Sequence, residues 1–195
     1  MASNKEWKWG YITPQGQFAI CPAFDGASDF SEGLAAVKTG WAAGYIDRTG
    51  AYAIAPAFGA AEEFRDGIAT VRLDGARLCI DRAGNIIGEA PPAPAPEFES
   101  GFDPHYEFHD GLVRFVENQK FGYKDREGRV IVKPRFFDAC DFSEGLAAVR
   151  NGKTSAWGYI DTAGRLAVPP RFRQAKPFRD GLAAVLVAVG TDTGE

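Results

Sequence analysis

The stretch DFSEGLAAV occupies Asp29–Val37 and returns unchanged at Asp141–Val149. Chance does not repeat nine residues in a chain of 195, so a structural unit has been copied along the sequence. The LAAV part of the stretch is apolar and has small side chains, which let packed layers of backbone approach closely. The rest of the chain contains further copies of this unit.

Several short signals mark each copy. The first is a Gly-Tyr pair after an aromatic or small residue, at Gly10, Gly44, Gly122 and Gly158, with Leu78 taking this position in the third copy. A turn signal follows, at Thr13–Gly16, Asp47–Gly50, Asp81–Gly84, Asp125–Gly128 and Asp161–Gly164. Next come two spaced phenylalanines: Phe24/Phe30, Phe58/Phe64, Phe102/Phe108, Phe136/Phe142 and Phe172/Phe178. Each copy closes with an acid–Gly pair and an apolar run, as in Glu32–Leu34.

The spacing of the turn glycines defines the repeat. Gly16, Gly50 and Gly84 lie 34 residues apart, and Gly128 and Gly164 lie 36 apart. The chain is therefore predicted to be a single repeat domain, residues 1–195, made of five units. Their approximate bounds are residues 7–37, 41–71, 75–116, 119–149 and 155–189, and a proline-rich insert at 88–97 lengthens the third unit.

These signals predict an all-β fold. Asp at the first and Gly at the fourth position suit a type I turn followed by a left-handed residue. Runs such as Phe18–Ile20 and Val130–Val132 are short and β-prone, and no segment shows a sustained helical period. We expect about three short antiparallel strands per unit, stacked into a curved, solenoid-like tandem-repeat array whose terminal units act as caps. The alternative is a five-bladed, propeller-like closure.

The motifs also resemble a known family. WGYI at Trp9–Ile12, WGYID at Trp157–Asp161 and the FSEGLA segments look like WG repeats, which are β-rich tandem repeats of bacteria, and the resemblance covers nearly the whole chain. Ala43 and Arg77 depart from the pattern by replacing the signature tryptophan. The resemblance implies a non-catalytic interaction scaffold, with protection against a secreted toxin as one such role, and it supplies no catalytic site.

Composition restricts the partners and the location. With 45% hydrophobic and 25% charged residues the chain is typical of a folded protein, and its net charge of −4 argues against nucleic acid and anionic membranes as partners. The N-terminus has no apolar core like that of a signal peptide, and the longest apolar run, Leu182–Val189, is too short to cross a bilayer. Cys21, Cys79 and Cys140 form no C-x-x-C pair, so we expect a reducing, cytoplasmic location.

The same residues give no support for catalysis, a cofactor or a metal site. There are two histidines and no nucleophile-elbow or phosphate-binding motif. Turn capping explains the recurring aspartates better than metal binding does: Asp47, Asp81, Asp125 and Asp161. The acids that precede glycine are likewise interpreted as turn-formers: Glu32, Asp66, Asp110, Glu144 and Asp180. A glycosidase would need two carboxylates at a set separation in a cleft, which the sequence does not specify.

The third unit breaks the pattern. It has ten extra residues, roughly Gly88–Glu97, whose four prolines favour an extended, exposed segment. Between Arg82 and Arg114 there is no Lys or Arg but there are six acids, and aromatic residues interleave with them. Residues 72–115 carry four basic and eight acidic residues, whereas residues 150–195 carry seven basic and four acidic residues, so charge is unevenly distributed along the chain.

We therefore predict that the third unit docks on a protein with a basic surface, because aromatic anchors and clustered carboxylates suit such a partner. The predicted contact residues are Glu97, Phe98, Glu99, Phe102, Asp103, His105, Tyr106, Glu107, His109 and Asp110. In its sharpest form the prediction is an immunity-type inhibitor that covers a toxin domain or an enzyme in the bacterial cytoplasm.

Other interpretations remain open at this point. The insert can be a tolerated surface loop, since loop length costs little entropy. His105 and His109 with nearby acids are a third possibility, a metal site. The rival functions are a carbohydrate or small-ligand module, which would stack ligands on Trp7, Trp9, Trp41 and Trp157, and a hydrolase.

Overall fold

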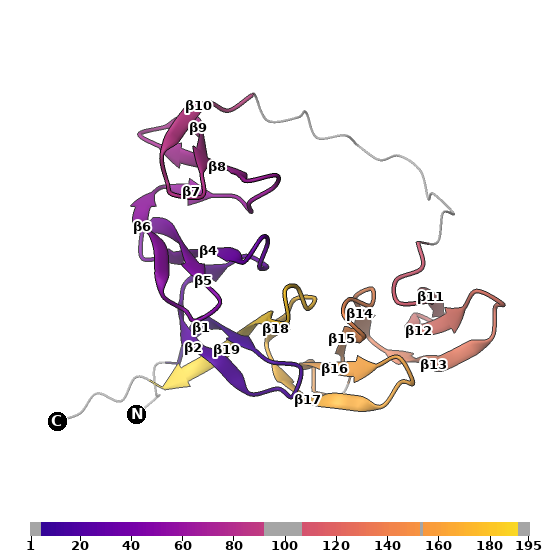
Figure 1. The fold of residues 1–195 in the computed structure, drawn as a ribbon. Helices are drawn as coiled ribbons and strands as arrows, with labels where there is room; N and C mark the ends of the chain where they lie inside the picture. The colour runs from indigo at the N-terminus through magenta and orange to yellow at the C-terminus, as the bar shows by residue number, and fades with distance from the viewer. Residues whose placement is uncertain (1–4, 92–106, 153, 191–195) are drawn as a thin grey trace.

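The computed structural model describes residues 5–91, 107–152 and 154–190, and every regular element in these ranges is a β-strand. The strands, which are labelled in Figure 1, form five small antiparallel sheets. We name these sheets A to E. Sheet A contains β18 (Gln174–Ala175), β19 (Ala183–Gly190), β1 (Lys5–Ile12) and β2 (Phe18–Phe24). Sheet B contains β3 (Gly26–Ala27), β4 (Leu34–Thr39), β5 (Ala42–Asp47) and β6 (Tyr52–Phe58).

The remaining sheets follow the same plan. Sheet C contains β10 (Ile86–Glu89), β9 (Ala76–Asp81), β8 (Ile68–Leu73) and β7 (Ala60–Ala61). Sheet D contains β11 (Leu112–Glu117), β12 (Lys120–Asp125) and β13 (Val130–Phe136). Sheet E contains β14 (Asp138–Ala139), β15 (Leu146–Arg150), β16 (Trp157–Asp161) and β17 (Leu166–Phe172). The predicted all-β array is confirmed, and most sheets add a two-residue strand to the three expected.

Four of the five sheets, B to E, combine the end of one repeat with the start of the next. In sheet B, for example, β3 and β4 come from the end of the first unit, and β5 and β6 come from the start of the second. A single unit therefore spans two neighbouring sheets. This arrangement leaves half a sheet without a partner at each end of the chain.

The two half-sheets pair with each other. β1 and β19 run antiparallel over eight residue pairs, from Lys5↔Gly190 to Ile12↔Ala183. The expectation that the terminal units act as caps is therefore wrong: the N- and C-terminal strands meet inside sheet A. The reason is that each strand presents an unpaired edge, and pairing satisfies both rows of backbone groups.

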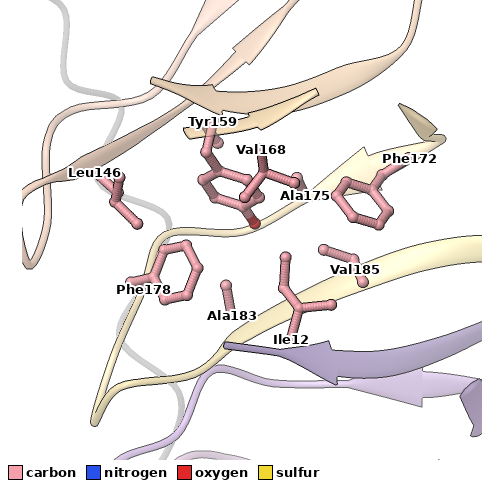
Figure 2. Packing of buried hydrophobic residues seen from close by; sticks show 10 residues of the cluster. Ile12, Leu146, Tyr159, Val168, Phe172, Ala175, Phe178, Ala183 and Val185 are labelled. Atoms are coloured by element: carbon pink, nitrogen blue, oxygen red, sulfur yellow. The ribbon is translucent and has the colours of Figure 1, made fainter. Parts of the chain in front are cut away.

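Four hydrophobic clusters join the sheets in the order C, B, A, E, D. Buried residues connect C with B, B with A, A with E, and E with D. Figure 2 shows the cluster between sheets E and A, where Tyr159 from β16, Phe178 from the loop before β19 and Ile12 from β1 are fully buried. Sheet A lies at the centre and contributes to two of the four clusters (Figure 1).

No such cluster joins sheets C and D among the described residues, so the array is open and not a closed propeller. The third unit is the one that spans these two sheets, from β9 and β10 to β11. It also lacks a key core residue. In the other four units a buried tyrosine donates its hydroxyl to a backbone carbonyl 17 residues ahead, but Cys79 takes this position in the third.

The glycine of the repeated Gly-Tyr pair is required by close backbone packing. A Cβ on Gly158 would lie 2.6 Å from the Val168 carbonyl oxygen and 2.7 Å from the Pro170 nitrogen. Gly10, Gly44 and Gly122 meet the equivalent backbone of their own units at 2.6–2.8 Å. Next to each of these glycines, the pairing with the strand that follows in the sequence shifts register. A bulge of that strand, which is β2, β6, β13 or β17, therefore passes directly over the glycine.

The acid–Gly turns link neighbouring units through a ladder of hydrogen bonds. In four turns the glycine N–H donates to the acid of the preceding unit: Gly145 to Asp110 (2.8 Å), Gly181 to Glu144 (3.0 Å), Gly33 to Asp180 (2.9 Å) and Gly67 to Glu32 (3.0 Å). The ladder passes without interruption from the last unit to the first. It ends at Asp66, which bonds to no residue in the described part of the chain.

We predict that Gly158→Ala destabilises the protein, because the new methyl group must displace backbone atoms of β17. The expected loss in unfolding free energy is about 2 kcal/mol, typical of overpacking. Urea denaturation measures it. Gly190→Ala is the control, since no atom lies within 4 Å of its Cβ position; equal stability of the two variants would contradict the account.

We also predict that Asp180→Ala is more destabilising than Asp66→Ala. Both residues have φ of 52°, so the backbone strain of the substitution is the same, but only Asp180 accepts a hydrogen bond from the next unit. The difference should be about 1 kcal/mol in unfolding free energy. If the two variants unfold at the same urea concentration, the ladder does not stabilise the array.

Candidate functional site

The predicted docking residues of the third unit lie mostly outside the described part of the chain. This applies to Glu97, Phe98, Glu99, Phe102, Asp103, His105 and Tyr106. Of the other three, Glu107 and His109 form an exposed contact of 3.7 Å between carboxylate and imidazole. Asp110 accepts the hydrogen bond from Gly145, so its carboxylate serves the ladder between units.

The strands on either side of this segment place it in the fold. β10 belongs to sheet C and all four of its residues, ending at Glu89, are exposed. β11 begins at Leu112 in sheet D, and Arg126 lies over the ring of Phe108 just before it, 5.3 Å from the centroid. The acidic connection therefore runs between the two end sheets of the array.

The recurring turn aspartates cap their turns, as predicted. Oδ1 of Asp81, for example, accepts hydrogen bonds from the Ala83 and Asn85 amides, both at 2.9 Å. Hydrogen bonds from the Asn85 side chain and backbone lower the pKa of the Asp81 carboxyl. Asp47, Asp125 and Asp161 make the same backbone contacts. In the described ranges no group of three His, Cys, Asp or Glu residues is arranged to hold a metal ion.

A groove of about 560 Å³ lies where sheets A and E meet. Trp9 of β1 and Trp157 of β16 occupy equivalent positions in the first and last units, and both line it half-buried. Three cationic side chains share the lining: Arg150, Arg173 and Lys176. The polar lining residues include Asp138, Ser155 and Gln174. We call this the tryptophan groove; sequence reasoning did not identify it.

Cations lie over the rings of three tryptophans. Lys176 Nζ is 5.9 Å from the ring centroid of Trp9, and Arg150 Cζ is 5.8 Å from that of Trp157. Arg173 Cζ is 5.1 Å from that of Trp7, which is 45% exposed beside the groove. Trp41, which is 92% exposed on the β4–β5 turn, has no such contact with a cation of the described residues. The four tryptophans proposed as stacking platforms are therefore not equivalent.

Two titratable groups near the groove are partly buried. Burial raises the pKa of the Asp29 carboxyl, and Lys176 Nζ, 3.8 Å away, acts in the opposite direction. Burial also raises the pKa of the Cys140 thiol to about 11. Because the thiolate is the reactive form, Cys140 is a poor nucleophile at neutral pH. The residues that the structure describes contain no helix long and apolar enough to cross a membrane.

The chain was compared with known proteins. A search of curated proteins found no match. Among solved structures, the chain is similar to a crystal structure of a eukaryotic initiation factor at 12% sequence identity and a TM-score of 0.28, over 89% of this chain and 55% of that one. A likeness this weak carries no argument about function. The comparison with protein families matches the WG containing repeat at residues 9–40, 44–75, 121–154 and 157–187, which leaves the third unit unmatched. These four matches cover more than half of the chain, and the protein belongs to the WG-repeat family.

Proposed function

We propose that this WG-repeat protein is a non-enzymatic protein-binding scaffold, and in its most specific form an immunity-type inhibitor. Family membership supports the coarser statement, a repeat-based protein-binding module. The finer proposal is that the acidic third unit covers a basic surface on a toxin domain or an enzyme in the cytoplasm.

The observation that carries the finer proposal is the place of the acidic segment in the fold. The four core clusters join sheet A to B, B to C, D to E and E to A. Sheets C and D share no cluster among the described residues. The connection between these two sheets is the part of the chain with six acids and no Lys or Arg. Negative charge is therefore concentrated in the connection between the two sheets that share no core cluster among the described residues.

Such a segment suits a basic partner for two physical reasons. Clustered carboxylates raise the association rate with a positive surface and pair with its Lys and Arg side chains. Interleaved aromatic residues supply the large contact areas that dominate binding energy at protein interfaces. Glu97, Glu99, Asp103 and Glu107 are the proposed charged contacts, and Asp110 is set apart because its carboxylate is used within the array.

The test is affinity capture from the native cytoplasm with two immobilised variants. In the first, Glu97, Glu99 and Glu107 become Gln and Asp103 becomes Asn. In the matched control, the same substitutions neutralise the exposed acids Glu6, Glu117, Glu127 and Asp74, which lie outside the third unit. We expect a basic partner that binds the control like the intact protein and binds the first variant about tenfold more weakly.

Salt dependence provides an independent measurement on the captured pair. Binding through an acidic face should weaken as ionic strength rises, because exposed charges are screened within about 10 Å at 0.1 M salt. A partner that binds both variants equally, or whose affinity does not change with salt, would show that the third unit is not the docking surface.

A further inference from the structure

The hydrogen-bond ladder between the acid–Gly turns has two unused ends, and these ends are complementary. Inside the array, each acid accepts a hydrogen bond from the glycine N–H of the next unit. Asp66, in the turn before β8 of sheet C, accepts no such bond from a described residue. Gly111, in the turn before β11 of sheet D, donates its N–H to no acid in the described ranges. One end of the array therefore carries a carboxylate, and the other carries the kind of N–H group that such a carboxylate accepts elsewhere.

A repeated arginine makes a second contact between neighbouring sheets. Arg82 and Arg126 follow the turn aspartates of sheets C and D. Arg82 donates from Nη2 to the backbone carbonyl oxygen of Glu32, in the acid–Gly turn of sheet B, at 2.8 Å. Arg126 is the equivalent residue of sheet D, and the equivalent turn on sheet C is the one that contains Asp66. In the structure Arg126 is exposed and lies over the ring of Phe108. Sheet D therefore carries two groups that elsewhere in the array bind the acid–Gly turn of a neighbouring sheet.

Apolar residues at these two ends are exposed where their equivalents inside the array are buried. In the order D, E, A, B, each sheet places a leucine in the cluster that it shares with the next sheet, and these leucines are 6–8% exposed: Leu112, Leu146, Leu182 and Leu34. Ile68 has this position in sheet C and is 44% exposed. On sheet D, Phe108 is only partly buried, whereas its four equivalents are at most 2% exposed. A further sheet of the repeat would bury these side chains at either end.

A hollow of about 500 Å³ lies on sheet C where a further sheet would pack. Ile68 and Thr70 of β8 contribute to its lining. Their equivalents in sheet B, Leu34 and Ala36, are buried in the cluster that sheet B shares with sheet C. The hollow is therefore the place that the next sheet of the repeat fills at an internal junction.

Charge favours contact between the two ends and disfavours contact between like ends. Residues 112–136, which span sheet D, carry seven basic and three acidic residues, whereas residues 60–89, which span sheet C, carry four basic and six acidic residues. On sheet D, Lys124 takes the position of an isoleucine that is fully buried in the other four units: Ile12, Ile46, Ile80 and Ile160. Sheet D therefore suits sheet C electrostatically, and two D ends would repel each other. The lysine also makes this contact more polar than the internal junctions, which is typical of reversible association.

We propose that the protein associates head to tail with a second copy of itself, so that sheet D of one copy packs on sheet C of the other. The Gly111 N–H and Arg126 of one copy bind the turn at Asp66 of the other, which continues the ladder, and Phe108 packs beside Ile68. Within one chain the two sheets lie at opposite ends of the open array (Figure 1), and no cluster of described residues joins them. The contact is heterologous, so its rotation determines whether a ring or a filament forms.

Sedimentation velocity of the full chain over a range of concentrations tests the proposal. The average mass of the intact chain should rise above the 21.1 kDa of the monomer as the concentration increases. Asp66→Ala removes the acceptor on sheet C and Arg126→Gln removes a donor on sheet D, and each should weaken association about tenfold. Asp74→Ala and Lys133→Gln are the matched controls, because both residues are exposed on the same two sheets and Asp74, with φ of 50°, has the backbone conformation of Asp66. Both controls should associate like the intact chain.

A mixture of the two variants tests the head-to-tail arrangement. The Asp66→Ala chain keeps an intact sheet D and the Arg126→Gln chain keeps an intact sheet C, so together they should form a 1:1 complex more tightly than either associates with itself. The version in which the acids of the third unit are neutralised should associate like the intact chain, which separates this proposal from the proposed function. A chain that stays at 21.1 kDa up to about 1 mM, an equal loss in the controls, or a mixture that associates no better than its components would each overturn the proposal.

Discussion

The pairing of β1 with β19 is the interaction on which the rest of the structure depends. Sheets B to E each take their strands from two consecutive units, so a linear array of such units necessarily begins and ends with half a sheet. The two halves complete each other through eight residue pairs. The resulting sheet A contributes buried residues to the clusters on both of its sides, and it supplies one wall of the tryptophan groove. Loss of this pairing would expose apolar surface on both neighbouring sheets.

The separation of sheets C and D has a local cause in the sequence of the third unit. In four units the tyrosine of the Gly-Tyr pair packs against the second phenylalanine of the unit, with the ring planes inclined by 59–65° and the centroids 4.7–4.9 Å apart, and ties two sheets together. The third unit has Cys79 at this position and ten extra residues before its first phenylalanine. Without the tyrosine and with a longer connection, sheets C and D become the two ends of the array, and the hydrogen-bond ladder stops between them.

Sequence reasoning predicted what is local within a unit. The Asp-x-x-Gly turns and the short strands depend on neighbouring residues, and DFSEGLAAV identified the repeat. It did not predict which strands share a sheet, because the repeat of the sequence and the boundary of the sheet differ by half a unit. The bond from Gly33 to Asp180 joins residues at opposite ends of the chain, and no local pattern specifies it. The tryptophan groove was missed for the same reason, since Trp9 and Trp157 meet only through the terminal pairing. Its visible signals were the excess of basic residues in 150–195 and the tryptophans Trp9 and Trp157, which sequence reasoning named as possible stacking residues without placing them together.

Hydrogen exchange measured peptide by peptide tests the central claim most directly. If β1 and β19 form the middle of the array, their amides should exchange as slowly as those of β4 and β5, because opening them requires disruption of two cores. The fastest exchange among the long strands should then occur in β10 and β11, at the two ends. If β1 and β19 exchange first instead, the terminal strands are frayed caps and the central pairing is wrong.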